Sequence, residues 1–259
     1  MTQVFCVANQ KGGVGKTTTT VNLAAALTKI WQKILLIDLY PQGNATMGSG
    51  VDKHNLPHSV YEVLIKTDTI DHAVTDSRCG YKVLGANREL AGAEIELVDQ
   101  PRREQRLKDA INKISQKYDF ILIDCPPALS ILTLNGLCAA HGVIVPMQCE
   151  YFALEGLADL VATIKQVHAN LNRDLKLIGL LRVMFDGHIT LQAQVSQQLK
   201  DYFGDKVFNT VIPRNVRLAE APSYGVPGVI FDPNAKGSKA FMSFAYEMVQ
   251  RGLTDNTDA

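Results

Sequence analysis

The sequence predicts an α/β domain with a mostly parallel, twisted sheet that is covered by helices on both faces. Two observations indicate this class. Short apolar runs that suit buried strands alternate with longer segments of helical spacing. The first apolar run also leads through a glycine-rich segment directly into a helical segment, which is the context of a phosphate-binding loop. We find no linker or repeat, so one domain is expected over residues 1–259, with a disordered acidic tail at 254–259.

The expected strands are almost wholly apolar, and two of them end in a carboxylate. A run without polar positions is typical of a strand buried on both faces. The run around residue 83 is the weakest of the set. The strands are expected at Val4–Ala8, Ile34–Asp38, Tyr81–Gly85, Tyr118–Asp124, Gly142–Met147, Leu175–Val183 and Val207–Ile212.

The expected helices carry apolar residues at helical spacing, as Leu23, Leu27 and Ile30 do in the first one. Asn55 to about Val74 should be a short helical excursion with loops, and Leu90 to about Gln116 a helical stretch that Pro101 breaks. The regular helices are expected at Thr17–Ile30, Leu129–Ala140, Ala153–Leu171, Leu191–Phe203 and Lys236–Arg251.

Residues 9–20, Asn-Gln-Lys-Gly-Gly-Val-Gly-Lys-Thr-Thr-Thr-Thr, predict a phosphate-binding loop and so a P-loop NTPase fold. The glycines let backbone N–H groups point at phosphate oxygens, and the following helix adds its N-terminal donors. Lys16 would reach the β- and γ-phosphates, and the Thr17 hydroxyl would bind Mg²⁺. Gln10 replaces the usual first glycine, and the loop instead fits the form K-G-G-x-G-K-[ST]-[ST]. Its expected ATP-binding residues are Lys11, Gly12, Gly13, Val14, Gly15, Lys16, Thr17 and Thr18.

Asp38 and Asp124 each end an apolar strand. In a parallel sheet, ligands bind beyond the carboxyl ends of the strands. We therefore expect both carboxylates and the glycine loop to meet at one edge. Asp124 would hold Mg²⁺ through a water, as a Walker B carboxylate does. The plainer alternative is a carboxylate that caps the next turn.

Composition limits the remaining function classes. The formal net charge is zero, so any binding to nucleic acid must come from a local patch. Five cysteines without C-x-x-C spacing indicate reduced, buried thiols in a cytoplasmic protein. No apolar run approaches the length of a membrane span, and the apolar positions of the last helix suggest a core-facing stripe. We therefore expect no membrane partner.

Several segments together resemble the ParA/Soj chromosome- and plasmid-partitioning ATPases, within the wider group that includes MinD and the nitrogenase iron protein. The resemblance extends over nearly the whole chain. Residues 37–46 are similar to the family segment D-x-D-P-Q-G-N, and residues 149–157 and 211–223 are similar to segments specific to ParA-type proteins. The matching segments are Lys11–Thr18, Ile37–Thr46, Leu90–Leu97, Asp124–Pro127, Cys149–Leu157 and Val211–Ser223.

The resemblance implies a protein that binds ATP and Mg²⁺ and forms a homodimer around two nucleotides. The dimer would bind double-stranded DNA without sequence preference, and a ParB-type centromere-binding protein would stimulate its slow hydrolysis of ATP. The expected location is the cytoplasm, in association with the nucleoid. By position, Lys11 would cross the dimer interface, and Lys16, Thr17 and Asp124 would serve the phosphates and the metal. Pro213 and Asn215 would lie near the adenine.

Tyr40 departs from the family pattern, because it stands where D-x-D-P-Q has its second carboxylate. In the family that aspartate orients the attacking water. The candidate catalytic residues are Lys11, Lys16, Asp38, Tyr40 and Asp124. A neutral phenol is bulkier and a poor base, so we expect ATP binding to survive and hydrolysis to be weakened. The alternative is that Tyr40 turns away and Asp38 or a bound water takes over.

The second departure concerns DNA. Residues 165–239 contain ten Lys and Arg against six Asp and Glu, a bias that would support salt-dependent contacts to phosphates. The family has a DNA-contacting arginine where this chain has His188, and another where it keeps Arg217. Histidine is mostly neutral at pH 7, so weaker DNA binding is expected. The candidate DNA-binding residues are Arg217, His188, Arg214 and Lys236.

Three other interpretations stay open at this point. An electron donor like the nitrogenase iron protein would need cysteines that hold a cluster. A membrane switch like MinD would need a basic amphipathic C-terminal helix, whereas this chain ends in an acidic tail. A nucleotide-binding clamp that forms a stable ATP dimer without significant hydrolysis is the serious rival, because of Tyr40.

Overall fold

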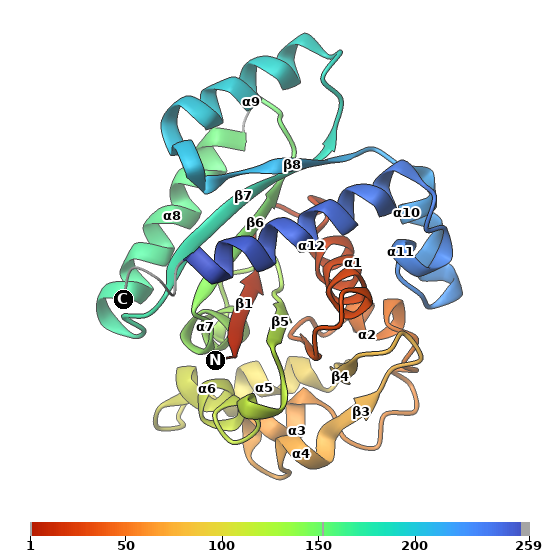
Figure 1. The fold of residues 1–259 in the computed structure, drawn as a ribbon. Coiled ribbons are helices and arrows are strands. Elements are labelled where there is room, and N and C mark those ends of the chain that lie inside the picture. The colour runs from red at the N-terminus through yellow and green to blue at the C-terminus, as the bar shows by residue number, and fades with distance from the viewer. Residues whose placement is uncertain (1, 152, 255–259) are drawn as a thin grey trace.

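The structure is a computed structural model that describes residues 2–151 and 153–254 (Figure 1). Of the predicted acidic tail, only Thr254 lies within these residues, at the end of the last helix, and the rest falls outside them. No helix among the described residues is long and apolar enough to cross a membrane.

The described residues form one eight-stranded sheet in the order β3-β4-β2-β5-β1-β6-β7-β8. Every neighbouring pair is parallel except β3 and β4, so the predicted fold class is confirmed. The antiparallel edge strand β3 was not predicted, and it begins at Val74, where the expected helical excursion was placed to end. The strands are β1 (Gln3–Val7), β2 (Ile34–Asp38), β3 (Val74–Asp76), β4 (Lys82–Leu84), β5 (Phe120–Asp124), β6 (Gly142–Met147), β7 (Lys176–Phe185) and β8 (Val207–Pro213).

The five regular helices lie where the sequence predicts them, to within three residues at each end. The stretch from residue 90 to 116 is two short helices joined through a 3₁₀ turn at Arg103–Gln105, next to the predicted break at Pro101. The helices are α1 (Lys16–Lys29), α2 (Asn44–Gly48), α3 (Val60–Ile65), α4 (Ile70–Ala73), α5 (Leu90–Glu96), α6 (Arg106–Ile111), α7 (Ile131–Ala139), α8 (Ala153–Asn170), α9 (Thr190–Phe203), α10 (Val216–Glu220), α11 (Gly228–Phe231) and α12 (Lys236–Thr254).

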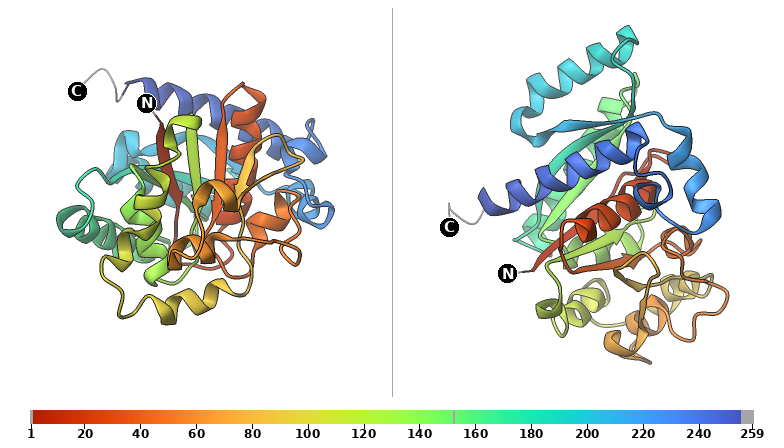
Figure 2. Two further views of the ribbon diagram at one scale, coloured as in Figure 1. Left: turned by 90° about the horizontal axis from the view of Figure 1, so that it is seen from below. Right: turned by 45° about the vertical axis from the view of Figure 1, so that its right-hand side comes forward.

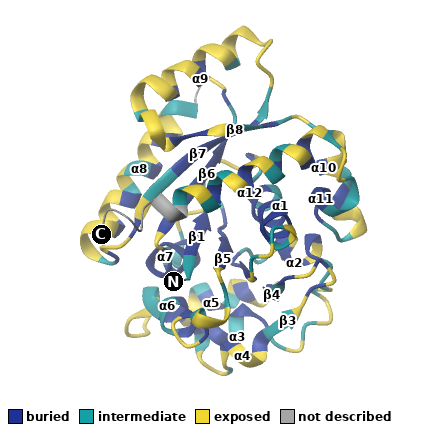
Figure 3. Cartoon of the chain, viewed as in Figure 1, coloured by how far each residue is buried: buried dark blue, intermediate teal, exposed yellow. Residues whose placement is uncertain are grey.

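Helices cover both faces of the sheet. On one face α1 and α12 lie side by side, as Figure 1 and Figure 2 show. The predicted apolar stripe of α12 faces the core: Phe241, Phe244 and Met248 are buried, and the ring of Phe244 meets that of Phe208 edge-on at 4.8 Å. The second core, on the other face, includes residues of α3 and α5–α9. Figure 3 shows α1 buried along most of its length and α9 largely exposed.

The carboxyl ends of β1, β2 and β5 coincide. Val7 and Asp38 both stand opposite Asp124 in the strand pairing. The loops that leave these three strands therefore start from neighbouring points on one edge. The structure confirms the expectation that both carboxylates and the glycine loop meet there.

Candidate functional site

The glycine loop adopts an open conformation that only glycine tolerates well. Gly13 has φ +72° and Gly15 has φ +77°, in the left-handed region. A Cβ atom added at Gly12 or Gly13 would meet no other atom within 4 Å, so the space beside this backbone is free. Val14, in contrast, is buried and anchors the loop. The loop therefore presents its backbone to an open pocket from a fixed position.

Lys16 begins α1 and is largely buried. Its Nζ donates to the carbonyl oxygen of Lys11 at 2.9 Å, and it has no other hydrogen-bond partner in the described part of the chain. Burial lowers the pKa of the Lys16 ammonium, and the negative charge of Asp124 opposes this shift. A buried ammonium with N–H bonds to spare is suited to bind an anion.

Asp124 is the centre of a buried polar cluster. Its Oδ2 accepts a hydrogen bond from the Thr17 hydroxyl at 2.7 Å, and its Oδ1 accepts one from Thr20 at 3.1 Å. Burial raises the pKa of Asp124, and the nearby charge of Asp38 raises it further, while Thr17, Thr20 and Lys16 oppose both effects. A hydroxyl and a carboxylate at this distance provide the oxygen atoms that Mg²⁺ prefers, so the residues present fit the metal.

Asp38 is fully buried, and its hydrogen-bond partners belong to the segment that follows β2. Its oxygens accept hydrogen bonds from the Tyr40 N–H at 3.0 Å, the Thr46 N–H at 2.9 Å and the Thr46 hydroxyl at 2.8 Å. The Thr46 hydroxyl in turn accepts the Ala86 N–H at 2.9 Å. Burial raises the pKa of Asp38, although these hydrogen bonds oppose the shift. Asp38 thus fixes the segment that carries Tyr40 and α2.

Tyr40 lines the same pocket as the glycine loop. This cavity of about 350 Å³ is bounded by the loop, the start of α1, Tyr40, Gln42, Asn44, Pro127 and Met184. The side chain is half-buried, so the residue that departs from the family pattern stands beside Lys16 and Thr17. Its effect on hydrolysis stays a prediction.

A second, smaller cavity of about 160 Å³ adjoins the first, and both are lined by Gly15, Thr18 and Met184. Pro213 and Asn215, the two residues expected near an adenine, line this cavity. Asn215 also caps α10, since its side chain accepts the Leu218 N–H at 3.3 Å. The structure thus places both residues next to the phosphate-binding loop.

Sequence reasoning missed four residues of the site: Thr20, Thr46, Gln148 and Met184. Gln148 donates from Nε2 to the Gly13 carbonyl at 3.2 Å and to the sulfur of Met184 at 3.3 Å. Met184 has φ +51°, which is uncommon for a side chain of its size and has no signature in the sequence. Thr20 could have been found, because it follows Lys16 by one helical turn and therefore shares its face.

Lys11 is not among the residues that line this pocket. Its Nζ pairs with Glu150 at 2.5 Å, and both side chains are about half exposed. Exposed pairs of this kind contribute little to stability. The predicted role of Lys11 across a dimer interface stays a prediction, and the side chain is free to exchange this partner for another.

The candidate DNA-binding residues lie at the carboxyl ends of β7 and β8. His188 follows β7, and Arg214 and Arg217 follow β8, whose last residue is paired with the end of β7. Arg217 pairs with Glu220 at 2.9 Å and with Asp232 at 3.5 Å, and Asp232 shortly precedes Lys236 in α12. All four candidate residues are exposed.

The charge bias of residues 165–239 needs a correction. Arg182 is buried, and its guanidinium donates to Ser196 and to the carbonyls of Phe208 and Asn209, so it adds nothing to a surface patch. Lys200 and Lys206 line a cavity at the opposite end of the sheet. The counted window therefore mixes two separate surfaces.

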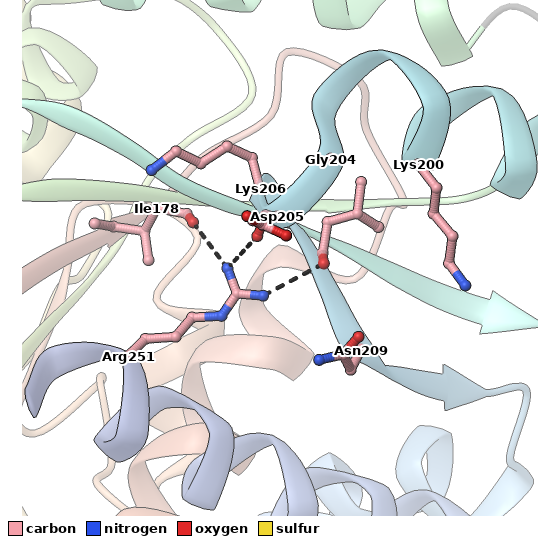
Figure 4. Close-up of a pocket in the computed structure, with 8 residues that line it drawn as sticks. Ile178, Lys200, Gly204, Asp205, Lys206, Asn209 and Arg251 are labelled. Carbon is pink, nitrogen blue, oxygen red and sulfur yellow. Dashed lines mark hydrogen bonds between the residues drawn. The ribbon is translucent and has the colours of Figure 1, made fainter. Parts of the chain in front are cut away.

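The cavity beside Lys200 and Lys206, at about 580 Å³, is larger than the pocket at the glycine loop. Figure 4 shows Arg251 of α12 pointing into it. The guanidinium donates to the carbonyl oxygens of Ile178, Asp205 and Val207, at 3.4, 2.8 and 3.3 Å. It also packs over the Phe208 ring, 4.2 Å from its centroid. These contacts fasten α12 to the sheet, so we assign this cavity a structural role.

Comparisons with known proteins agree with this geometry. A family model described as "AAA domain" matches residues 2–177. Sporulation initiation inhibitor protein Soj of Bacillus subtilis is 47% identical over 97% of this chain and 100% of its own. Chromosome-partitioning ATPase Soj of Thermus thermophilus is 48% identical over 95% of each chain. A solved structure titled cobyrinic acid a,c-diamide synthase from Mycobacterium smegmatis, with bound ADP and magnesium, has a TM-score of 0.87 and 40% identity over 98% of this chain and 97% of that one.

Thr46→Val should lower the free energy of unfolding by about 2 kcal/mol. The change keeps the volume of the side chain. It leaves the Ala86 N–H and one lone pair of the buried Asp38 without their partner. Urea denaturation of the two proteins measures the difference.

Thr28→Val is the matched control, because its hydroxyl donates only to the Ala24 carbonyl within α1. We expect this variant to change the free energy by less than about 0.5 kcal/mol. Equal losses in the two variants would show that the Asp38–Thr46–Ala86 network contributes no special stability.

Proposed function

The chain belongs to the ParA/Soj family of chromosome-partitioning ATPases, and we propose that it acts as an ATP-dependent dimerising switch in DNA segregation. In this proposal the ATP-bound homodimer binds double-stranded DNA without sequence preference, in the cytoplasm on the nucleoid. A ParB-type centromere-binding protein is the proposed partner that stimulates hydrolysis. The observation that carries the proposal is the Lys16–Thr17–Asp124 cluster beside an open glycine loop.

We assign the nucleotide to the two adjoining cavities. The loop N–H groups and Lys16 would hold the phosphates, and Pro213 and Asn215 would lie beside the base. Thr17 would bind Mg²⁺ directly and Asp124 through a water. Bound Mg²⁺ supplies charge neutralisation at the phosphate oxygens. The ADP and magnesium in the related Mycobacterium smegmatis structure support this assignment.

Dimerisation is proposed to use Lys11. This lysine is held only by an exposed ion pair with Glu150, which it can give up without a large loss of stability. In the family the equivalent lysine reaches the nucleotide of the partner subunit. The negative charge of the γ-phosphate would favour that exchange, which makes dimerisation depend on ATP.

DNA binding is proposed to use the region formed by His188, Arg214, Arg217 and Lys236. The carboxylates that pair with Arg217 offset part of its charge, and position 188 holds a histidine where the family has an arginine. Both features favour weak binding, and the contacts to phosphates that remain make this binding dependent on salt.

A second candidate function is a clamp that binds ATP and dimerises without significant turnover. Tyr40 favours it, since a phenol lines the pocket at the position of the family aspartate. Asp38 is a poor substitute, because it is fully buried and already accepts three hydrogen bonds. Among the described residues, no acidic side chain lines this pocket.

Tyr40→Asp should raise the rate of ATP hydrolysis at least about tenfold, because it supplies a carboxylate that can orient the attacking water. The rate is measured as phosphate release with saturating ATP and Mg²⁺, alone and with DNA and a ParB-type protein. Tyr40→Phe is the matched control and should stay as slow as the unmodified chain, since it keeps the ring and also lacks a carboxylate.

Equal turnover of the unmodified chain and Tyr40→Asp would refute the weakened hydrolysis and leave a working ATPase. If Tyr40→Asp alone hydrolyses ATP, the unmodified chain is the clamp.

Arg217→Ala should weaken binding of the ATP-bound protein to DNA by roughly tenfold for all sequences and reduce the slope of log K against log salt by about 0.9. Fluorescence anisotropy with duplexes of unrelated sequence provides both values. Arg173→Ala is the control, because Arg173 is an exposed arginine just before β7, at the opposite end of the sheet. If both variants lose the same affinity, the proposed DNA-binding region is wrong.

A further inference from the structure

Three potential metal ligands converge outside the nucleotide site. The Nδ1 atom of His58 lies 2.8 Å from Oδ2 of Asp68, and the Nδ1 atom of His72 lies 2.9 Å from the same oxygen. The two imidazole rings are close, with centroids 4.2 Å apart and planes inclined by 45°. All three ligand atoms lie within 4.8 Å of one another. Two imidazoles and one carboxylate thus face one point.

The backbone around these residues is held in place by local hydrogen bonds. His58 directly precedes Ser59, the N-cap of α3, whose capping box with Glu62 is complete. Asp68 lies in the turn between α3 and α4, where its Oδ1 accepts the Thr69 N–H at 2.7 Å. His72 lies in α4 itself. The convergence therefore rests on ordered backbone on both sides.

We propose that His58, Asp68 and His72 form a binding site for a divalent transition-metal ion of the Zn²⁺ type. Imidazole nitrogens suit Zn²⁺, Ni²⁺ and Cu²⁺ and do not suit Mg²⁺, so this site differs in chemistry from the one at Thr17. Three protein ligands leave a fourth position for water, as in open zinc sites.

The distances permit such a site after a small adjustment. Ligand atoms around a tetrahedral ion with bonds near 2.0–2.1 Å are about 3.3 Å apart. The two Nδ1–Oδ2 distances of 2.8 and 2.9 Å would open by a few tenths of an ångström, and the separation of the two imidazole nitrogens, which is within 4.8 Å, would have to come to a similar value. The side chain of His72 is 63% exposed and that of His58 is 34% exposed, so both rings have room to move.

Metal binding at this place would join the start of α3 to α4. The first N–H of α3, on Val60, donates to the Gly85 carbonyl at 2.8 Å, and the next residue, Ala86, donates to Thr46. Hydrogen bonds through residues 85 and 86 therefore connect the start of α3, next to the site, to the network that holds Asp38. We expect the ion to stiffen this segment and to raise the melting temperature of the protein.

The test is a calorimetric titration of the full chain with Zn²⁺ in the presence of excess Mg²⁺. A parallel titration uses Co²⁺ as a spectroscopic probe, and the melting temperature is measured with and without Zn²⁺. We expect one equivalent to bind, with a visible Co²⁺ absorption typical of nitrogen and oxygen ligands and a raised melting temperature. His72→Gln and His58→Gln should each weaken Zn²⁺ binding roughly tenfold or more.

His54→Gln is the matched control, because His54 is an exposed histidine of the same segment that lies outside the cluster. It should bind Zn²⁺ like the unmodified chain. Unchanged nucleotide binding by the variants shows that they fold. The proposal is overturned if no equivalent of Zn²⁺ binds, or if His72→Gln and His58→Gln bind it as tightly as His54→Gln does.

Discussion

The structure depends on one buried carboxylate, that of Asp124, whose two oxygens both accept hydrogen bonds. Asp124 ends a central strand, is 1% exposed, and stands next to the end of β2 with its own buried Asp38. Burial of such groups is costly, so Thr17, Thr20 and the Lys16 ammonium must stand close to Asp124. This requirement docks the start of α1 against β5 and fixes the glycine loop between them. The same contacts of Asp124 therefore form the site and pack α1 against the edge of the sheet.

Binding and turnover are separable in this arrangement. The groups suited to phosphates and Mg²⁺ lie on the loop, α1 and β5, and all of them are retained. The group that should orient water lies on the segment after β2, where Tyr40 replaces a carboxylate. Asp38 and Thr46 hold that segment regardless of the residue at position 40, because they bond through the Tyr40 backbone and α2. Nothing in the fold has to change when the side chain at that position changes.

Much of this could be predicted from the sequence, because buried parallel strands and the phosphate loop have strong local signatures. The meeting of Asp38, Asp124 and the loop followed from strand order in parallel sheets alone. The edge strand β3 could not be predicted, since only Val74 of its three residues is apolar. Met184 and Thr46 were missed because their roles depend on contacts far along the chain. The buried Arg182 shows the same limit, since a count of charges does not report which of them reach the surface.

Sedimentation velocity of the unmodified chain tests the central claim most directly, when it is run without nucleotide, with ADP and Mg²⁺, and with ATP and Mg²⁺. The account predicts a monomer in the first two conditions and a dimer with ATP. That dimer should persist for hours, because the site binds ATP and lacks the carboxylate that orients water. A monomer in the presence of bound ATP would contradict the ATP-dependent dimer, and a dimer that dissociates rapidly as phosphate is released would contradict the weakened hydrolysis.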